Sequence, residues 1–318
     1  MTGNPISSDN PEPMPRAVFM GTPAVAVSVL AALRGVAQVA LVITRPDRPR
    51  GRSRRLKSPP IKETAREWSL PVAQPESAAE LLDVVRAVEP DVAVVAAYGR
   101  LIAVELLEVP GHGFVNVHCS LLPRWRGASP VVRSILAGDD ETGVSLIRMD
   151  AGFDTGPIIA SEVVPIDSGH TTGSLSEELA TVGGRLLVTA LPPYLAGQTE
   201  AVPQDDAMTT AAAKVTTDEA HIYPALHSTE AVDRAVRAFN PKPGAWCLFH
   251  GERLKIWKST SAQDVESTPG EVRMIDGKVI LGNRTGSTEL VTVQPSGKPM
   301  MSGIAWMNGR RGEPAELR

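Results

Sequence analysis

Residues 16–33, RAVFMGTPAVAVSVLAAL, place an apolar strand, a tight turn and an apolar helix in immediate succession. The run 16–20 is short and almost wholly apolar, which is typical of a strand that is buried on both faces. Gly21-Thr22-Pro23 predicts a turn, with Thr22 as the N-cap of the helix and Pro23 at its first position. This stretch therefore predicts the first β–turn–α unit of an α/β domain.

The same alternation of strand and helix continues downstream. Strands are predicted over residues 39–44, 70–72, 90–97, 114–118 and 144–149, and helices over residues 60–68, 77–88, 130–138 and 174–191. The last helix is expected to end at Pro192-Pro193, because proline removes a backbone donor. Such alternation predicts an α/β fold with a doubly wound, mainly parallel sheet, and it places the functional site at the carboxyl ends of the strands.

The character of the sequence changes after residue 213. One helix is predicted over residues 229–239, and short strands follow at close spacing, which indicates a small antiparallel barrel. The strands are expected near residues 246–250, 253–258, 271–275, 278–281 and 288–294. The expected organisation is a disordered tail over 1–15, a first domain over 16–195, a linker over 196–213 and a second domain over 214–318.

Composition excludes several classes of protein. The chain has 318 residues, enough for two cores, and 42% of them are apolar. No apolar run reaches the roughly 18 residues that a membrane-spanning helix needs, so no membrane association is expected. Two cysteines cannot form a disulfide framework, and we expect a cytoplasmic protein. The net charge of −4 by itself argues against an obligate nucleic-acid binder, and the long acidic remainder of the chain indicates a monomer.

One segment has the opposite charge. Residues 45–57, RPDRPRGRSRRLK, hold seven Lys or Arg and one Asp, so they carry +6 while the rest of the chain carries −10. A run of this kind is either a solvated surface or a site for phosphate groups.

Two polar residues occupy the end of the predicted strand 114–118. Residues i and i+2 of a strand share a face, so Asn116 and His118 point the same way. An amide can stabilise a developing oxyanion and an imidazole can move a proton, a combination suited to acyl transfer. Downstream, Asp154 lies between Gly152 and Gly156 on a loop after the next strand and could reach the same place.

Other chemistries lack support in the sequence. The histidines and cysteines do not have metal-ligand spacing, and no serine-nucleophile motif is present. The turn after the first strand is not GxGxxG, which argues against a nicotinamide-dependent oxidoreductase. A histidine at a strand end and an aspartate between glycines are often structural, so spacing alone leaves that interpretation open.

The stretches NVHCSLLPRWRGASP (116–130) and DAGFDTG (150–156) resemble the signature of folate-dependent formyltransferases. The resemblance covers roughly residues 16 to 310, including TRPDRPRGRSRRLKSPPIK (44–62) and VRAFNPKPGAW (236–246). The core motif is shared by the whole family, whereas the basic segment and the second domain are similar to the branch that acts on tRNA. The resemblance implies a Rossmann-like first domain and an OB-like barrel that supports the tRNA.

The resemblance also assigns roles to residues. Asn116, His118 and Asp154 are the implied catalytic residues, and 10-formyltetrahydrofolate is the implied formyl donor, with no metal required. The implied folate contacts are Ser120, Leu121, Leu122, Pro123, Tyr98 and Gly99. The implied product is formylmethionyl-tRNA, made by transfer of the formyl group to the α-amine of methionine on initiator tRNA.

The basic segment acquires a role from the same resemblance. It is similar to an insertion loop that enters the acceptor stem of the initiator tRNA. Arg52 is the implied acceptor contact. Arg48, Arg54, Arg55 and Lys57 are the implied phosphate contacts, and their affinity would depend on salt.

Alternatives are a formyltransferase for a small amine, such as a nucleotide-linked amino sugar or glycinamide ribonucleotide, and a formyl-folate hydrolase. A tRNA-binding protein without turnover is a third alternative. The charge of the basic segment argues against the first two, and the complete Asn116–His118–Asp154 set argues against the third. The sequence departs from the family pattern at Cys119, inside the signature, and at Tyr223-Pro224, near the start of the second domain.

Overall fold

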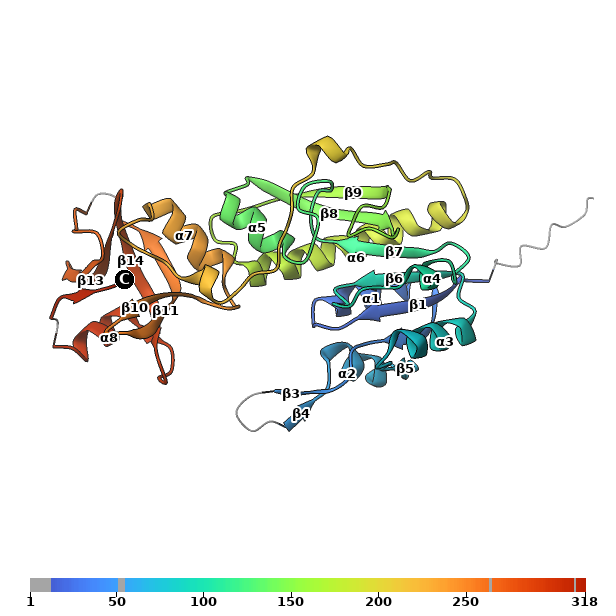
Figure 1. The fold of residues 1–318 in the computed structure, drawn as a ribbon, viewed down its shortest axis with the longest axis horizontal. Coiled ribbons are helices and arrows are strands. Elements are labelled where there is room, and N and C mark those ends of the chain that lie inside the picture. Colours follow the sequence, from blue (N-terminus) through green and yellow to red (C-terminus); the bar gives the residue numbers. More distant parts are fainter. Residues whose placement is uncertain (1–12, 51–54, 263–264, 312) are drawn as a thin grey trace, which may run out of the picture. The chain divides into compact units, whose positions relative to one another are not determined.

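The computed structural model of the protein describes residues 13–50, 55–262, 265–311 and 313–318 (Figure 1). Most of the tail expected over residues 1–15 therefore lies outside the described residues. The chain divides into two compact units. The first comprises residues up to 118 together with 146–160 and 183–203, and the second comprises 119–145, 161–182 and 204–318. The predicted division into domains at 196–213 stays a prediction.

The helices are α1 (Ala26–Leu33), α2 (Pro60–Glu67), α3 (Ala78–Val88), α4 (Val104–Leu107), α5 (Pro130–Ala137), α6 (Thr172–Leu195), α7 (Thr229–Ala238) and α8 (Gly303–Asn308). The first nine strands are β1 (Arg16–Gly21), β2 (Gln38–Ile43), β3 (Arg48–Arg50), β4 (Arg55–Lys57), β5 (Val72–Ala73), β6 (Val92–Ala96), β7 (Phe114–His118), β8 (Glu141–Arg148) and β9 (Ile158–Pro165). The remaining strands are β10 (Ala245–Phe249), β11 (Glu252–Ser261), β12 (Glu271–Ile275), β13 (Lys278–Asn283), β14 (Gly286–Pro295), β15 (Met301–Ser302) and β16 (Ala315–Glu316).

The large sheet has the strand order β5-β2-β1-β6-β7-β8-β9. β1 lies between β2 and β6 and is parallel to both, so Phe19 faces Val42 on one side and Val94 on the other. β7 continues the parallel array, with Asn116 opposite Val95 of β6. The predicted doubly wound, mainly parallel sheet is confirmed, and the change of direction in strand order lies beside β1.

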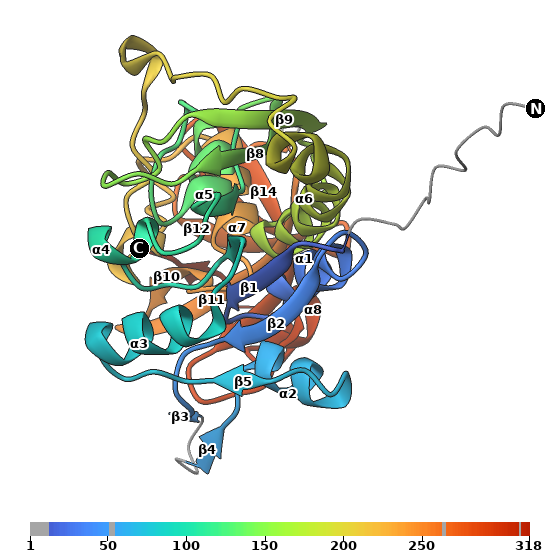
Figure 2. The same ribbon diagram turned by 90° about the vertical axis from the view of Figure 1, so that its right-hand side faces the viewer.

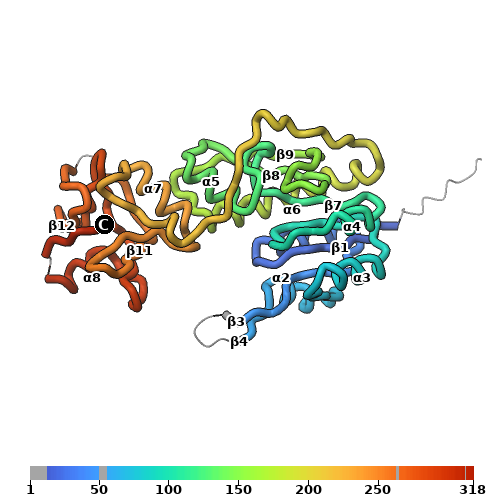
Figure 3. Tube along the Cα trace, in the orientation of Figure 1, coloured from blue at the N-terminus to red at the C-terminus, as the bar shows by residue number. Residues whose placement is uncertain are grey.

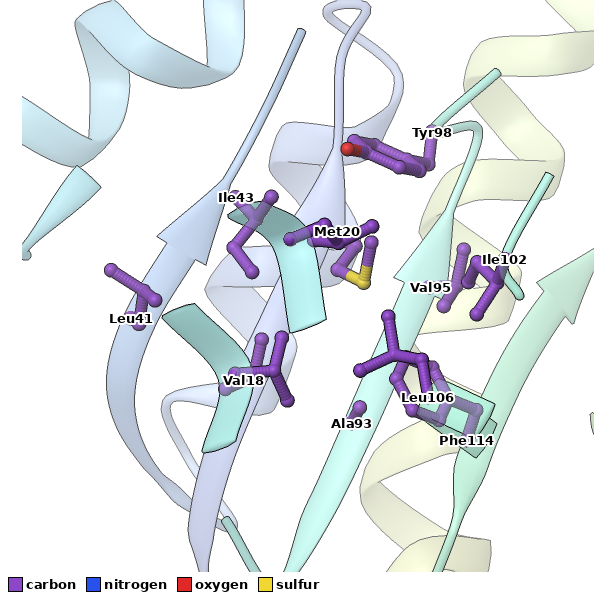
Figure 4. Close-up of a cluster of buried hydrophobic side chains, with 12 residues drawn as sticks. Val18, Met20, Leu41, Ile43, Ala93, Val95, Tyr98, Ile102, Leu106 and Phe114 are labelled. Atoms are coloured by element: carbon purple, nitrogen blue, oxygen red, sulfur yellow. The ribbon is translucent and has the colours of Figure 1, made fainter. Parts of the chain in front are cut away.

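Helices cover both faces of this sheet within the first unit (Figure 2). One face carries a buried cluster in which Leu81 and Val85 of α3 meet side chains of β1, β2 and β6 (Figure 4). On α6, a β-carbon built on Gly184 would lie 3.1 Å from the β-carbon of Ala32, so α6 and α1 pack closely. Burial on both faces explains why these strands are continuous apolar runs.

Two predicted helix boundaries are wrong. Helix α1 begins at Ala26 rather than after Thr22, and its N-cap Val25 makes no side-chain cap. The hydroxyl of Thr22 instead donates to the carbonyl oxygen of Tyr98 at 2.9 Å. A side chain that finds a distant backbone acceptor is not available for capping its own helix.

Helix α6 begins at Thr172 and continues through Pro192 and Pro193 to Leu195, beyond the predicted stop. Proline lacks an N–H but keeps its carbonyl, and those of Pro192 and Pro193 accept bonds from Ala196 and Gln198. The helix therefore loses donors near its end without losing its last turn.

The segment predicted as a basic loop contains a short β-hairpin. β3 and β4 pair antiparallel, with Arg48 opposite Lys57. In Figure 1 this hairpin projects away from the large sheet within the first unit. Residues 51–54, which connect the two strands, lie outside the described residues.

The second unit contains the predicted small antiparallel barrel. Its strand order is β10-β11-β14-β13-β12-β16, and β15 pairs with β14. Figure 3 traces the chain through this part, with β11 and β12 labelled. Reciprocal backbone bonds between Leu248 in β10 and Arg318, two residues after β16, join the first and last strands of this path. The prediction of a curved antiparallel sheet in this part of the chain is confirmed.

The segment predicted as a linker is held by backbone bonds. In the first unit, Val202 exchanges a pair of hydrogen bonds with Ile158 of β9, each 2.8 Å long. In the second unit, Ala212 donates to Arg126 at 2.7 Å, and Arg126 donates to Thr210 at 2.9 Å. This extended connection is therefore anchored at both ends.

Candidate active site

Strand β7 positions two of the predicted catalytic side chains. The strand has alternate faces, and Asn116 and His118 lie on the same one at its carboxyl end. His118 is buried, with 6% of its surface exposed, whereas Asn116 is half-buried. The strand is parallel to β6, so this pair lies at the edge of the sheet where α/β proteins bind ligands.

Asp154 meets both residues from the loop after β8. Its Oδ1 accepts a hydrogen bond from Asn116 Nδ2 at 3.2 Å and lies 3.6 Å from His118 Nδ1. The predicted trio is therefore brought together, although 36 positions separate His118 from Asp154 along the chain. One carboxylate oxygen faces an amide donor and an imidazole edge at the same time.

The loop that carries Asp154 is fixed by its own sequence. The carboxylate of Asp150 accepts bonds from the N–H of Gly152 at 3.0 Å and from the hydroxyl of Thr155 at 2.6 Å. Asp154 has φ of 56°, in the left-handed region that polar Asp and Asn adopt more readily than most residues. A β-carbon on Gly156 would collide with the carbonyl oxygen of Arg148. The pattern DAGFDTG thus specifies one compact loop that aims Asp154 at β7.

This arrangement has a direct electrostatic consequence. A carboxylate beside Nδ1 fixes the orientation of the imidazole ring, because electrostatic attraction is strong where little water intervenes. The side chain of Asp154 is 18% exposed, so the pair is only weakly screened.

Tyr98 and Gly99, predicted folate contacts, follow β6. Their carbonyl oxygens accept bonds from the Thr22 hydroxyl at 2.9 Å and from Arg45 Nη1 at 3.3 Å. The ring of Tyr98 is 2% exposed and belongs to the buried cluster of Figure 4, and this burial raises the pKa of its phenol. Tyr98 therefore supports its loop from the core, and the backbone around Gly99 is the part that can meet a ligand.

The other predicted folate contacts lie in the second unit. The hydroxyl of Ser120 donates to the carbonyl oxygen of Arg124 at 2.7 Å. Ser145 fixes the backbone of the loop 120–123. Its hydroxyl donates to the carbonyl oxygen of Ser120 at 2.8 Å and accepts from the N–H of Leu122 at 3.1 Å. Leu122 is buried, whereas Leu121 and Pro123 are half-buried. Ser120 thus shapes this loop through its hydroxyl.

The structure places some of the predicted tRNA contacts and not others. Arg48 and Lys57 are exposed and face each other across the hairpin. Arg55 belongs to β4, while its side chain is outside what the structure describes. Arg52 and Arg54 fall within 51–54 and lie outside the described residues.

Sequence reasoning missed a polar cluster at the base of this hairpin. Lys62 Nζ lies 2.8 Å from both carboxylate oxygens of Asp47, and Gln74 Nε2 donates to Asp47 Oδ1 at 2.8 Å. A signal was present, because Lys62 falls in the first turn of a predicted helix, where a cation is unfavourable without an anionic partner.

Within the described residues, no group of three or more His, Cys, Asp or Glu side chains is arranged to hold a metal ion. No helix in the same part of the chain is long and apolar enough to cross a membrane.

Comparisons with known proteins match almost the whole chain. Residues 15–191 match the family described as formyl transferase, and residues 214–311 match the formyl transferase C-terminal domain. A methionyl-tRNA formyltransferase of Halorhodospira halophila is 44% identical over 95% of this chain and 98% of its own length. Another, from Chloroflexus aggregans, is 40% identical over 92% of this chain and 97% of its own length.

Solved structures share the fold at lower identity. The N-formyltransferase of Helicobacter canadensis, in complex with folinic acid and dTDP-3-aminofucose, superposes with a TM-score of 0.64 at 19% identity, covering 89% of this chain and 99% of that one. HypX of Aquifex aeolicus, in complex with tetrahydrofolic acid, gives a TM-score of 0.65 at 16% identity over 92% of this chain. The chain spans about half the length of HypX, 47%. At these identities the likeness concerns the fold alone.

Proposed function

The chain belongs to the methionyl-tRNA formyltransferase family, and from that premise we propose that it transfers the formyl group of 10-formyltetrahydrofolate to the α-amine of methionine on initiator tRNA. The observation that carries the proposal is the 44% identity to a methionyl-tRNA formyltransferase over 95% of this chain. The compared span contains both the segment with the trio and the basic hairpin.

The reaction needs a group that stabilises negative charge on the formyl oxygen as the amine adds to the formyl carbon. Asn116 has two amide N–H groups, and one of them is directed to Asp154. We assign the second to the formyl oxygen. A fixed amide donor aimed at a developing oxyanion typically contributes about 3 kcal/mol to the reduction of the barrier.

Proton movement falls to His118 and Asp154. The attacking amine must lose a proton, and the leaving nitrogen of the folate must gain one. His118, with Nδ1 toward Asp154, hydrogen-bonds the developing oxyanion together with Asn116 when its ring is protonated. Asp154 stabilises the positive charge of that ring and is the carboxylate through which the proton passes between the two nitrogens.

We assign the folate contacts to Ser120, Leu121, Leu122 and Pro123 and to the backbone of the Tyr98-Gly99 loop. The fit is supported by the fixed backbone of both segments, since each is held by hydrogen bonds from Ser145 or from Thr22 and Arg45. Small folate rings are recognised by such preformed loops more readily than by mobile ones.

The basic hairpin supplies the tRNA contacts. We assign Arg48, Arg52, Arg54, Arg55 and Lys57 to the acceptor end of initiator tRNA, with Arg52 at the first base pair. The net charge of +6 over residues 45–57 supports this assignment, because phosphate groups supply most of the affinity of a protein for nucleic acid. A small amine substrate would have no use for that charge, which disfavours the alternative of a small-molecule formyltransferase.

The remaining features of the proposal concern organisation. We propose a catalytic domain over 16–195, a linker over 196–213 and an OB-like tRNA-supporting domain over 214–318, supported by family matches that end at 191 and resume at 214. We further propose that the enzyme is cytoplasmic and monomeric. Two free cysteines are consistent with a reducing compartment.

The decisive test compares two tRNAs. Formyl incorporation from 10-formyltetrahydrofolate would be measured with charged initiator methionyl-tRNA and, in parallel, with charged elongator methionyl-tRNA. Labelling of the initiator alone is the expected result. Labelling of neither, with folate binding intact, would move the activity to a small-molecule amine.

A further inference from the structure

Outside the trio, a partly buried polar cluster lies between β2 and α2. The side chain of Lys62 contacts both carboxylate oxygens of Asp47 at 2.8 Å. Gln74 donates to the same carboxylate at 2.8 Å and, through the same nitrogen, to the carbonyl oxygen of Arg45 at 2.7 Å. The three side chains join the segment before the hairpin to the helix after it and to the segment that follows β5.

The position of Lys62 is unfavourable for a cation. Its side chain is only 9% exposed, and it lies in the first turn of α2, where the peptide dipoles repel positive charge. A buried ammonium without a partner is strongly disfavoured. The contacts to Asp47 therefore stabilise the charged side chain of Lys62 at this position. The same contacts hold the pKa of Asp47 below its usual range, the hydrogen bond from Lys62 being the largest cause.

The cluster closes the base of the basic hairpin. Asp47 immediately precedes β3, and Lys62 follows the end of β4 by five residues. Arg48 and Lys57, the pair of residues nearest the base, are both exposed. Figures 1 and 2 both show the hairpin leaving the body of the first unit at this point. The direction of the hairpin is therefore set where Asp47 and Lys62 meet.

We propose that Lys62, acting through Asp47 and Gln74, is a positioning residue that fixes the direction in which the basic hairpin presents its cations to tRNA. The inference rests on the proposed function, because it concerns how the same enzyme holds its tRNA substrate. A contact of Arg45 supports this inference. Its Nη1 donates to the carbonyl oxygen of Gly99, so the segment between β2 and the hairpin also contacts the loop assigned to folate.

Loss of the anchor has a specific consequence. A hairpin that is free to turn must be ordered when tRNA binds, and the ordering entropy weakens binding without altering the chemistry. The Michaelis constant for tRNA should rise, while folate affinity and the turnover rate at saturating tRNA stay near those of the wild type. If Lys62 had a purely structural role, its loss would weaken tRNA binding, weaken folate binding and slow turnover together.

The variant Lys62→Met removes the charge and keeps the length of the side chain. Arg86→Met is the matched control, because it removes one exposed cation from α3 of the same unit and Arg86 is not among the groups that act on Asp47. Lys62→Arg is the conservative rescue, and Gln74→Leu removes the second donor to Asp47. Each variant would be measured for the dissociation constant of initiator tRNA at several salt concentrations, for the Michaelis constant of charged initiator tRNA, and for folate affinity.

For Lys62→Met we expect tRNA affinity and the Michaelis constant to worsen by about tenfold or more, since an anchored loop binds with less loss of entropy. In a plot of the logarithm of the tRNA association constant against the logarithm of salt concentration, the slope should become shallower by about one or more. The reason is that fewer phosphates are engaged at once. Gln74→Leu should show a smaller loss in the same direction, and Lys62→Arg should restore at least half of the lost affinity on a logarithmic scale.

Two outcomes would overturn the inference. The first is tRNA affinity in Lys62→Met within twofold of that in Arg86→Met. The second is a parallel loss of folate affinity and tRNA affinity in both Lys62→Met and Gln74→Leu, which would indicate general damage to the first unit. These results do not depend on formylation, because tRNA affinity is measured without turnover. Absence of formylation by the wild type would instead refute the proposed function.

Discussion

Asp154→Asn isolates the charge of the carboxylate at the centre of the trio. The substitution keeps the shape of the side chain and an oxygen that can accept from Asn116, and it removes the negative charge that faces His118. Two unit charges 3.6 Å apart, the separation of Asp154 Oδ1 and His118 Nδ1, attract by about 4.6 kcal/mol at an effective dielectric constant of about 20. Since each 1.36 kcal/mol corresponds to about tenfold in rate, full loss of this attraction lowers the rate by about three orders of magnitude.

The measured loss should lie between about 10² and 10³, because Asp154 retains some exposure and solvent screens part of the attraction. Single-turnover formylation of charged initiator tRNA would report the chemical step. The affinities for tRNA and folate should remain within about threefold of the wild type, since the substitution keeps size and hydrogen-bond geometry. Asp83→Asn, which neutralises an exposed carboxylate on α3, is the matched control and should leave the rate unchanged. A single-turnover rate for Asp154→Asn within fivefold of this control would refute the electrostatic reasoning.

Three further changes have defined outcomes. His118→Ala should lower turnover by at least about 10²-fold with tRNA affinity intact, because a positioned acid–base group contributes about that much; a rate near wild type would remove it from proton transfer. Arg52→Ala should weaken productive use of initiator tRNA and lower the salt slope by about one, and identical kinetics across tRNA concentrations would exclude that contact. Gly156→Ala should abolish activity and lower the melting temperature, because its β-carbon would collide with Arg148; unchanged activity and melting would show that the loop adapts.

Cys119 yields a prediction about reactivity. Burial raises the pKa of its thiol to about 11, so little thiolate is present near neutral pH. Alkylation by iodoacetamide at pH 7.5 should be slower than that of a free model thiol by about 100-fold, and the rate should still be rising with pH above pH 9. Mass spectrometry of the peptide containing Cys119 would measure both. Rapid alkylation at neutral pH would indicate that solvent reaches the sulfur and that burial does not control it.

The large sheet was predictable because its strands are encoded locally. Strand β7 was predicted over residues 114–118, the bounds that the structure gives. A strand buried on both faces must be an apolar run, and the polar Asn116 and His118 stand out against that background. The same periodicity that predicts the strand also places these two side chains on one face. The core of the proposed site therefore follows from the pattern of a single strand.

Features that depend on distant partners were harder to predict. Thr22 has the sequence signature of an N-cap, yet its hydroxyl bonds to Tyr98, 76 residues away. Hairpin β3–β4 has no alternating apolar pattern, and its described side chains, Arg48, Pro49, Leu56 and Lys57, are exposed rather than packed. Strand β9, IIASEVVP, was not predicted, because Ser161 and Glu162 interrupt its apolar residues. In each case the missing information is a partner across space or a weak local pattern.

The trio and the hairpin anchor differ in the same way. Asn116 and His118 are two residues apart on one strand, and the glycines around Asp154 predict a tight loop. Local sequence patterns therefore identify all three as candidate site residues. Asp47 and Lys62 are 15 residues apart across a hairpin, and Gln74 lies a further 12 residues on, so local rules link none of them. What the sequence does contain is a lysine in the first turn of a helix, a position that is stable only when a carboxylate approaches from elsewhere. A residue that violates a local preference in this way marks a long-range contact. Here the contact between Lys62 and Asp47 orients the basic hairpin, whose charge does not stabilise the fold.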